Sequence, residues 1–279
     1  MKKTMFLLWA ILLTTAVVSG QESYEIWNGP APGEPDETTR PTCELYQPAE
    51  KKTDACLIVF PGGGYHHLAV DHEGAQIAHF FTAHGMTTVV VKYRVPRREG
   101  QPKHLPAWQD AQRAVRFVRS HAAEWGINPD KMGVMGFSAG GHLTLMTATT
   151  SLTNSYEPQD DLDKVSASVQ FAVPVYPAYV LEDGADGVNS GKGNDSKMVK
   201  DFAFDAATPP MCFIHGDEDG ISAMGSVAVY HQLRKMNIPG ELHIFSKTGH
   251  GFGANVTGDH VGDWLNRVWA WMVAMGYGA

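Results

Sequence analysis

Apolar residues along this chain gather in short β-rich runs that are separated by polar and amphipathic segments. Near-continuous apolar runs of this kind are typical of strands that are buried on both faces of a sheet. Six of them predict strands, at residues 55–60, 87–93, 131–137, 166–175, 210–215 and 241–245. Strands that alternate with helical segments predict a mostly parallel sheet with helices on both sides, which is a three-layer α/β fold.

Two amphipathic segments predict helices that pack one face on this sheet. In residues 106–124, the apolar side chains from Trp108 to Val118 share one face of a helix. Four charged residues lie off that face, namely Asp110, Arg113, Arg116 and Arg119. Near the end of the chain, apolar residues from Val261 to Met272 repeat at intervals of three and four, and they predict a final helix.

The first twenty residues have the pattern of an export signal. Two lysines precede an uncharged run from Met5 to Val18, and small residues follow it. A basic start, an apolar stretch of roughly 7–15 residues and small residues at the cut are typical of a secretory signal peptide. An uncleaved anchor is the alternative, although the run is shorter than the ~20 residues that span a bilayer. We therefore expect a signal peptide at 1–20, a single domain at 21–279, and a secreted or periplasmic protein.

Composition and charge narrow the class of protein. With 43% hydrophobic and 19% charged residues, a chain of 279 residues is able to bury one sizeable core. The net charge of −8 argues against a nucleic-acid binder, because such a chain cannot neutralise a run of phosphates. Three cysteines are too few for a disulfide framework. Cys43 is able to pair with Cys56 only if their strands are neighbours.

Two polar segments interrupt the alternation of strands and helices. Residues 28–41 are rich in Pro, Gly and charge, and they predict an ordered or a flexible lead-in to the domain. Residues 182–197 are polar and Gly-rich, and they predict an exposed loop. The Asp and Asn spacing in this loop does not match a calcium-binding loop that ends in a bidentate Glu.

The first stretch with candidate chemistry is Gly136-Phe137-Ser138-Ala139-Gly140-Gly141, which follows a predicted strand and opens a predicted helix. A Gly-x-Ser-x-Gly sequence in this context is typical of a nucleophile elbow, in which small neighbours allow a sharp turn and expose the serine hydroxyl. A plain glycine-rich turn is the alternative. The motif predicts Ser138 as a nucleophile.

The glycine run Pro61-Gly62-Gly63-Gly64-Tyr65 directly follows the strand at 55–60. Glycines allow backbone N–H groups to approach a developing oxyanion, so we expect Gly63 and Gly64 to donate to it together with Ala139, which follows the nucleophile. A structural turn is the alternative. A phosphate loop is excluded, because it requires a Lys followed by Ser or Thr at fixed spacing.

Two further stretches supply an acid and a base. The sequence HGDEDG (215–220) follows the strand at 210–215, and GHGFG (249–253) follows the strand at 241–245. Serine needs a neighbouring imidazole to take its proton, and the imidazole needs a carboxylate to fix its tautomer. One His among thirteen carries little weight alone. The order Ser, Asp, His, each just past the carboxyl end of a strand, favours a catalytic triad.

These motifs resemble the α/β-hydrolase superfamily and, more narrowly, the secreted bacterial carbohydrate esterases of the acetylxylan-esterase type. The resemblance covers residues 42–275 and is carried by PGGGY (61–65), DHEG (71–74), LPAWQDAQRAVRFVR (105–119), GFSAGG (136–141), HGDEDG (215–220) and GHGFG (249–253).

The resemblance implies a three-layer α/β-hydrolase fold and a Ser-His-Asp esterase without a metal or an organic cofactor. In this assignment Ser138 is the nucleophile, His250 is the general base and acid, and Asp219 orients His250. Many relatives have Val where this chain has Ser222, and this departure leaves Asp217 as an alternative acid. The related oxyanion motif usually begins with His where this chain has Pro61, but the glycine N–H donors survive that change.

Tyr65, His66 and Tyr176 are expected to line the substrate pocket, because they follow the glycine run and the strand at 166–175. The other histidines near the glycine run do not predict a metal site. His72 and His79 fall on a predicted helix without the i, i+4 pair that zinc proteases use.

The expected function is hydrolysis of acyl esters, above all acetyl esters, on a plant-type polysaccharide or oligosaccharide such as xylan. A feruloyl esterase, a lipase or general carboxylesterase, and a serine peptidase of the prolyl-oligopeptidase type are the alternatives. A non-catalytic carbohydrate-binding protein is also conceivable, but this chain retains all three triad residue types. We expect no nucleic-acid partner, and no membrane partner once the signal is removed. The sequence leaves the oligomeric state open.

Overall fold

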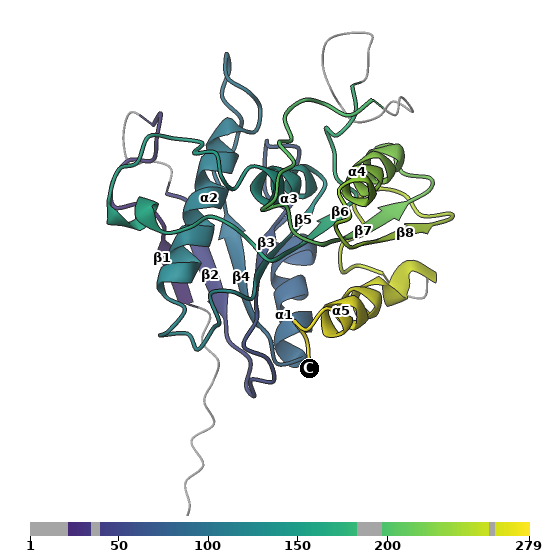
Figure 1. The fold of residues 1–279 in the computed structure, drawn as a ribbon, viewed down its shortest axis with the longest axis horizontal. Coiled ribbons are helices and arrows are strands. Elements are labelled where there is room, and N and C mark those ends of the chain that lie inside the picture. The colour runs from purple at the N-terminus through teal and green to yellow at the C-terminus, as the bar shows by residue number, and fades with distance from the viewer. Residues whose placement is uncertain (1–21, 35–39, 183–196, 257–259) are drawn as a thin grey trace, which may run out of the picture.

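The computed structural model describes residues 22–34, 40–182, 197–256 and 260–279, which fold into three layers (Figure 1). The middle layer is an eight-stranded sheet in the order β1-β2-β4-β3-β5-β6-β7-β8. Its strands are β1 (Glu22–Glu25), β2 (Thr42–Tyr46), β3 (Cys56–Phe60), β4 (Thr87–Lys92), β5 (Met132–Phe137), β6 (Phe171–Val175), β7 (Met211–Gly216) and β8 (Gly240–Phe245).

The sheet is parallel from β4 to β8, and only β1 and β2 run antiparallel to their neighbours. The prediction of a mostly parallel sheet is therefore confirmed. Every residue of β3, β5 and β6 is buried, as the near-continuous apolar runs predict. The run at 166–175 enters the sheet only at Phe171, because residues 166 and 168 give their backbone carbonyls to Arg119 instead.

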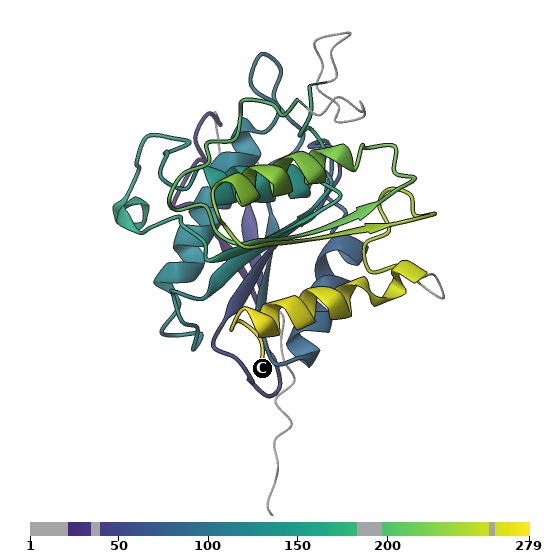
Figure 2. The same cartoon turned by 45° about the vertical axis from the view of Figure 1, so that its right-hand side comes forward.

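Helices cover both faces of the sheet (Figure 2). On one face lie α2 (Leu105–Ser120), α3 (Ala139–Thr149) and α4 (Met224–Lys235), and their buried side chains share one core with that side of the strands. On the other face lie α1 (Gln76–Ala83), which a π-helical turn (Asp71–Ala75) precedes, and α5 (Trp264–Ala274). Helix α5 confirms the final predicted helix. This arrangement is the α/β-hydrolase fold.

The charged side of α2 is buried as well as its apolar side. Arg113 is 1% exposed and its guanidinium bonds both Asp160 (2.6 Å) and Asp163 (3.0 Å). Asp110 is fully buried and accepts hydrogen bonds from Arg94. These residues lie off the sheet-facing stripe, as the period predicts, but they pack against connecting segments. Each of these buried charges has a charged or hydrogen-bonding partner, which offsets the free-energy cost of removing the charge from water.

All three cysteines are free and buried. Strand β4 lies between β2 and β3, so Cys43 and Cys56 are not on neighbouring strands and the condition for pairing them is not met. Burial raises the pKa of the Cys56 thiol to about 12, so it stays protonated and behaves as a small apolar side chain.

The signal peptide expected at 1–20 lies outside the described residues, as do 35–39 and most of the loop expected at 182–197. Those expectations remain predictions. Within the part of the chain that the structure describes, none of the helices combines the length and apolarity that crossing a membrane requires.

Candidate active site

The four motifs singled out in the sequence meet at one edge of the sheet. They lie at or just after the carboxyl ends of β3, β5, β7 and β8, which are parallel and therefore end at the same edge. In open α/β sheets this carboxyl edge is where ligands bind.

Ser138 sits on a strained turn between β5 and α3, with a φ of 53° and a ψ of −113°. Three backbone hydrogen bonds hold the turn in this conformation. The Ser138 N–H donates to the carbonyl of Val175 (3.0 Å), and the Ser138 carbonyl accepts from Ala178 and His142 (3.0 Å each). Strain of this kind persists only where surrounding contacts enforce it, and it is common at active sites.

The glycines on either side of Ser138 are required by space. A Cβ atom on Gly136 would collide with the carbonyl oxygen of Gly140, and a Cβ atom on Gly140 would collide with the carbonyl oxygen of Phe60. The close approach of α3 to the ends of β3 and β5 therefore depends on these two residues. This is the physical reason for the Gly-x-Ser-x-Gly pattern in this chain.

A continuous hydrogen-bond chain links Ser138, His250 and Asp219. The Ser138 hydroxyl lies 2.8 Å from His250 Nε2, and His250 Nδ1 lies 2.8 Å from Asp219 Oδ2. The His250 side chain is 32% exposed, whereas the Asp219 side chain is fully buried. A carboxylate on Nδ1 fixes the tautomer in which Nε2 is free to accept the serine proton.

The turn after β7 selects Asp219 rather than Asp217 as the partner of His250. The second oxygen of Asp219, Oδ1, accepts from the Ile221 N–H (2.6 Å), which fixes the rotamer of the carboxylate. Asp217 and Glu218 are exposed, and the Asp217 N–H donates to the Phe245 carbonyl (2.8 Å). The sequence did not decide between Asp217 and Asp219, because the side chains of two residues that lie two positions apart in a turn have no fixed direction relative to each other.

His215 is a buried neighbour of the Asp219 carboxylate, with Nε2 3.6 Å from Asp219 Oδ2. Its Nδ1 lies 2.9 Å from the Ser226 hydroxyl, and its Nε2–H donates to the Ile221 carbonyl (3.1 Å). Desolvation lowers the pKa of His215 to about 4. The His215 ring is therefore neutral at physiological pH, so it does not compete with His250 for the negative charge of Asp219.

The glycine run after β3 forms a turn with positive φ at Gly63 (131°) and Gly64 (66°). A Cβ atom on Gly63 would collide with the carbonyl of His67, so only glycine fits this turn. Gly63, Gly64, Ser138 and His250 all line one cavity of about 470 Å³. Ala139 begins α3, so its N–H has no partner within the helix. The backbone N–H groups of Gly63, Gly64 and Ala139 are the candidate oxyanion donors.

Glu73 is a residue of the site that sequence reasoning did not assign. It is 3% exposed and accepts from the Gly62 N–H (2.9 Å) and from the Tyr176 hydroxyl (2.7 Å). The sequence contained a signal, because Glu73 precedes the buried residues Ile77 and Phe81 by four and eight positions. An acid on the apolar face of a helix is expected to have a buried partner.

Of the expected pocket residues, His66 lines the cavity and Tyr65 and Tyr176 do not. Tyr65 is 1% exposed and its hydroxyl lies 2.8 Å from His142 Nδ1. Tyr176 is fully buried, with its ring 4.9 Å from the His250 ring. This corrects the expectation for both tyrosines. Each follows a strand end as expected, with a positive φ (62° and 35°), but its hydroxyl is held in the interior by a buried partner, His142 for Tyr65 and Glu73 for Tyr176.

Among the described residues, three potential metal ligands lie close together in each of two groups. One consists of His104, His142 and Asp201, and the other of Cys212, Glu241 and His243. Neither group includes a member of the Ser138–His250–Asp219 chain or lines the cavity beside it.

Comparison with known proteins gives the chain relatives among esterases. The BD-FAE family model matches residues 43–196. An acetylxylan esterase from Xylanibacter ruminicola is 29% identical over 218 residues, which are 73% of this chain and 42% of that protein. Endo-1,4-beta-xylanase B from Butyrivibrio fibrisolvens is 30% identical over 210 residues, which are 70% of this chain and 32% of that protein. The chain thus spans less than half the length of either relative.

Solved structures have the same fold. The acetyl ester-xyloside bifunctional hydrolase from Caldicellulosiruptor lactoaceticus is 28% identical, with a TM-score of 0.79 over 95% of this chain and 100% of that one. Native esterase 2 from Thermogutta terrifontis is 24% identical, with a TM-score of 0.72 over 93% of this chain and 94% of that one.

Proposed function

Since the chain belongs to the BD-FAE family and has the α/β-hydrolase fold, we propose that it is a serine esterase that removes acetyl groups from xylan-type polysaccharides or oligosaccharides. The single observation that carries the chemistry is the Ser138–His250–Asp219 hydrogen-bond chain, with 2.8 Å at each link. The acetyl and xylan parts of the proposal are supported by the names of the relatives, an acetylxylan esterase and an acetyl ester-xyloside hydrolase.

In the first step, the Ser138 oxygen attacks the ester carbonyl while its proton passes to His250 Nε2. The negative charge that develops on the carbonyl oxygen is stabilised by the N–H groups of Gly63, Gly64 and Ala139. Asp219 stabilises the imidazolium that forms. The protonated His250 then donates its proton to the sugar oxygen, the C–O bond breaks, and acetyl-Ser138 remains.

In the second step, a water molecule gives a proton to His250 and attacks the acetyl carbonyl. The oxyanion is held by the same N–H groups. Collapse of the intermediate returns the proton to Ser138 and releases acetate. The mechanism requires no metal and no organic cofactor at the reacting atoms.

The test is a panel of substrates given to the purified protein. We expect release of acetate from acetylated xylan and hydrolysis of p-nitrophenyl acetate, with little activity on feruloylated xylan, long-chain esters or a peptide amide. Activity on feruloylated xylan alone would make the protein a feruloyl esterase, and cleavage of the peptide amide would make it a peptidase. Activity on p-nitrophenyl acetate without release from xylan would leave a general carboxylesterase.

Export to the periplasm or the medium is part of the proposal, and it is supported by the basic start and apolar run before Gln21. N-terminal sequencing of protein recovered outside the cytoplasm should begin at Gln21. Protein that retains Met1 in the membrane fraction would instead indicate an uncleaved anchor.

A further inference from the structure

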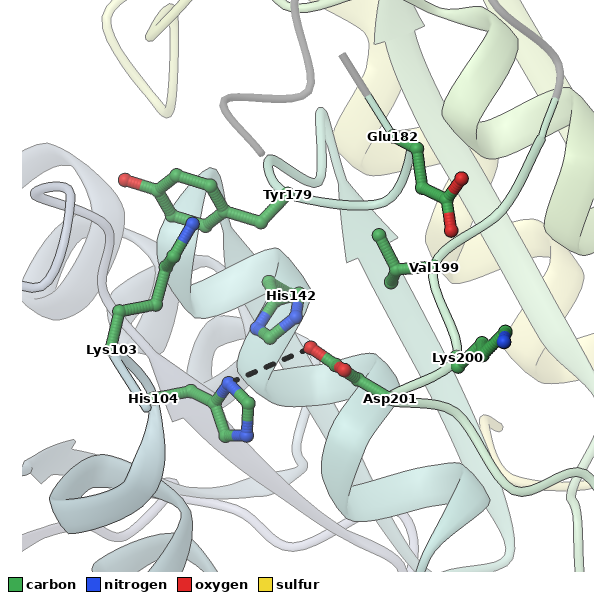
Figure 3. Close-up of a pocket in the computed structure, with 8 residues that line it drawn as sticks. All are labelled: Lys103, His104, His142, Tyr179, Glu182, Val199, Lys200 and Asp201. Atoms are coloured by element: carbon green, nitrogen blue, oxygen red, sulfur yellow. Dashed lines mark ion pairs between the residues drawn. The ribbon is translucent and has the colours of Figure 1, made fainter. Parts of the chain in front are cut away.

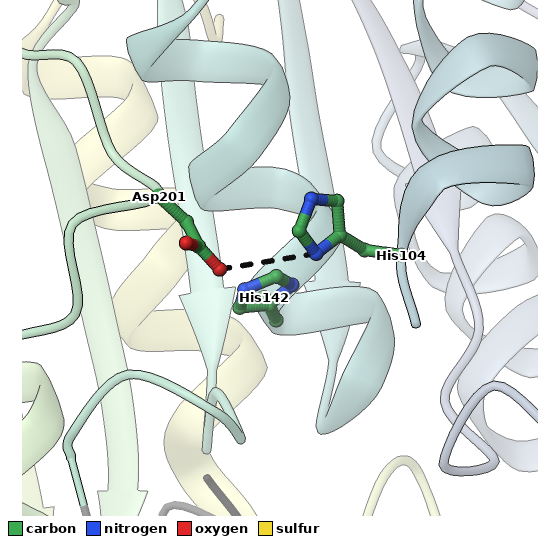
Figure 4. A group of neighbouring side chains, drawn as sticks. All are labelled: His104, His142 and Asp201. Atoms are coloured by element: carbon green, nitrogen blue, oxygen red, sulfur yellow. Dashed lines mark ion pairs between the residues drawn. The ribbon is translucent and has the colours of Figure 1, made fainter. Parts of the chain in front are cut away.

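Figure 3 shows a second cavity, of about 410 Å³, which shares no lining residue with the cavity that holds Ser138 and His250. Its lining includes His104, just before α2; His142, in the first turns of α3; and Asp201, in the segment that leads to β7. These three side chains converge from three separate parts of the chain (Figure 4), and their donor atoms all lie within 4.8 Å of one another.

His142 presents an unpartnered nitrogen. The residue is 1% exposed, its Nδ1 lies 2.8 Å from the Tyr65 hydroxyl, and its Nε2 has no hydrogen-bond partner among the described residues. When Nδ1–H donates to Tyr65, the Nε2 lone pair is left without a donor in a buried place. A buried polar atom of this kind requires an explanation. In metal sites, the imidazole nitrogen that does not bind the metal usually makes a hydrogen bond to another group, as His142 Nδ1 does with Tyr65.

His104 and Asp201 supply the remaining donors at a suitable spacing. His104 Nδ1 lies 3.9 Å from Asp201 Oδ2, which is too long for a hydrogen bond. Two ligands of a tetrahedral zinc ion at ~2.1 Å lie about 3.4 Å from each other, so a small rotation of the two side chains suffices. The Asp201 side chain is 45% exposed, which gives an ion a path from solvent.

We propose that His104, His142 and Asp201 bind a divalent transition-metal ion of the Zn²⁺ type, with a fourth coordination position open to the cavity. Two imidazoles and one carboxylate suit Zn²⁺, Co²⁺ or Ni²⁺, whereas Ca²⁺ and Mg²⁺ require sets of oxygen ligands. Lys103 and Lys200 also line the cavity, as does Glu182, whose carboxylate pairs with Lys197 (2.7 Å). Lys103 Nζ lies 4.2 Å from the centroid of the Tyr179 ring, which partly stabilises its charge there.

The second group of three ligands does not form an equivalent site. Cys212 is fully buried in the core beneath α5, and burial raises the pKa of its thiol, although a metal requires the thiolate. His243 Nε2 is already bonded to Glu241 (2.6 Å). This group therefore provides a matched control for the proposed one.

The ion acts on the structure rather than on the ester. His142 is four residues after Ser138, and the backbone N–H of His142 donates to the backbone carbonyl of Ser138 (3.0 Å). A metal on His142 therefore joins the helix that carries the nucleophile to the start of α2 and to the segment of Asp201. Binding to the folded protein alone raises its stability by mass action. The site does not depend on the proposed esterase reaction, and Ser138→Ala should bind the ion as the wild type does.

The test uses the protein without a polyhistidine tag, stripped with a chelator and titrated with Zn²⁺ by calorimetry and with Co²⁺ by visible absorption. We expect one ion per chain, Co²⁺ bands typical of four or five ligands, and a higher Tm with Zn²⁺. His104→Ala and Asp201→Asn should each weaken binding at least about tenfold, and His243→Ala should change it less than about twofold. Because His142→Ala removes a buried side chain, the test uses Tyr65→Phe instead, and we expect about tenfold weaker binding with an unchanged circular-dichroism spectrum.

Three results would overturn the proposal. The first is the absence of saturable binding. The second is binding that His104→Ala and Asp201→Asn leave unchanged. The third is binding lost in His66→Ala or His243→Ala, which would place the ion at the mouth of the catalytic cavity or in the control group. Esterase activity plays no part in this readout, so failure of the metal site and failure of the proposed function are distinguishable.

Discussion

The Tyr176 hydroxyl donates to Glu73 (2.7 Å) and accepts from the Gly253 N–H (2.9 Å). Glu73 also accepts from the Gly62 N–H (2.9 Å). One buried tyrosine thus joins the glycine run after β3, which offers oxyanion donors, to the loop after β8, which holds His250. The Tyr176 ring also packs edge-on against the His250 ring. The two halves of the proposed catalytic machinery are therefore positioned by the same side chain.

Tyr176→Phe should lower kcat by about tenfold and leave KM for a small ester within about twofold. The substitution removes the hydrogen bonds that the hydroxyl makes with the Gly253 N–H and with Glu73. Loss of a buried hydrogen bond typically costs ~1–3 kcal/mol, and about 1.4 kcal/mol corresponds to tenfold in rate where the loss is felt in the transition state. The measurement is steady-state kinetics on p-nitrophenyl acetate together with the Tm.

The matched control is Tyr277→Phe, which removes a hydroxyl that donates to the Gln170 carbonyl (2.8 Å) before the start of β6, at the opposite edge of the sheet. It should lower the Tm without changing kcat. If the two variants lose the same stability and the same activity, Tyr176 has only a structural role.

Ser138→Ala should abolish ester hydrolysis and leave the fold intact. Loss of a triad member typically costs on the order of 10⁴–10⁶ in rate. The fold should survive because the turn is held by backbone hydrogen bonds to Val175, Ala178 and His142, none of which uses the serine hydroxyl. Retention of more than a tenth of the wild-type rate, with a wild-type circular-dichroism spectrum, would remove Ser138 as the nucleophile.

Asp219→Asn should cost about 10³–10⁴ in kcat, because an amide favours the wrong tautomer of His250. Asp217→Asn should cost less than about tenfold, because Asp217 is exposed and only its backbone is bonded nearby. Both substitutions remove one charge from the same turn, so long-range electrostatics nearly cancel. The comparison is made on one acetyl ester at about pH 8, above the ordinary imidazole pKa. A larger loss at 217 would reverse the assignment.

Treatment with EDTA should leave kcat on p-nitrophenyl acetate within about twofold of its starting value, because no step of the proposed mechanism uses a metal. The same treatment should lower the Tm if the protein has been purified with zinc bound, since the proposed ion stabilises the fold only. Loss of kcat that Zn²⁺ restores would bring a metal into the reaction itself and contradict the mechanism.

The central strands were predictable because burial on both faces requires continuous apolar sequence, and β3, β5 and β7 are of this kind. Strands β1 and β2 were not predictable. They are short and antiparallel, and β1, at the edge, is largely exposed, so neither contains a long apolar run. β2 is placed by pairing with β4, and β1 by pairing with β2, and a local pattern does not contain these partners.

The site was predictable where backbone geometry restricts the residue type. Gly63, Gly136 and Gly140 are required by space, so their motifs are visible in the sequence. The positions of Tyr65 and Tyr176 were not predictable, because each is buried by a partner that is far away in the sequence, His142 or Glu73. Local sequence places a residue after a strand, but distant contacts decide the direction of its side chain.

His215 makes the protein sensitive to acid in a defined pH window. Burial lowers its pKa to about 4, below the ordinary value near 6.5, so the unfolded chain binds a proton that the folded chain does not. The resulting stability is present above about pH 6.5 and falls as the pH drops toward 4, by on the order of 3 kcal/mol. Below that pH the folded protein also takes the proton and the difference becomes constant.

His215→Gln should flatten this part of the pH profile, because glutamine cannot take up a proton. The measurement is the free energy of unfolding in urea at pH 7 and at pH 5 for both proteins. The wild type should lose more stability than the variant between the two values, whatever their stabilities at pH 7. Burial also lowers the pKa of His142, but that residue is present in both proteins, so the difference isolates His215. Equal losses in the two proteins would show that His215 is not the acid-sensitive group.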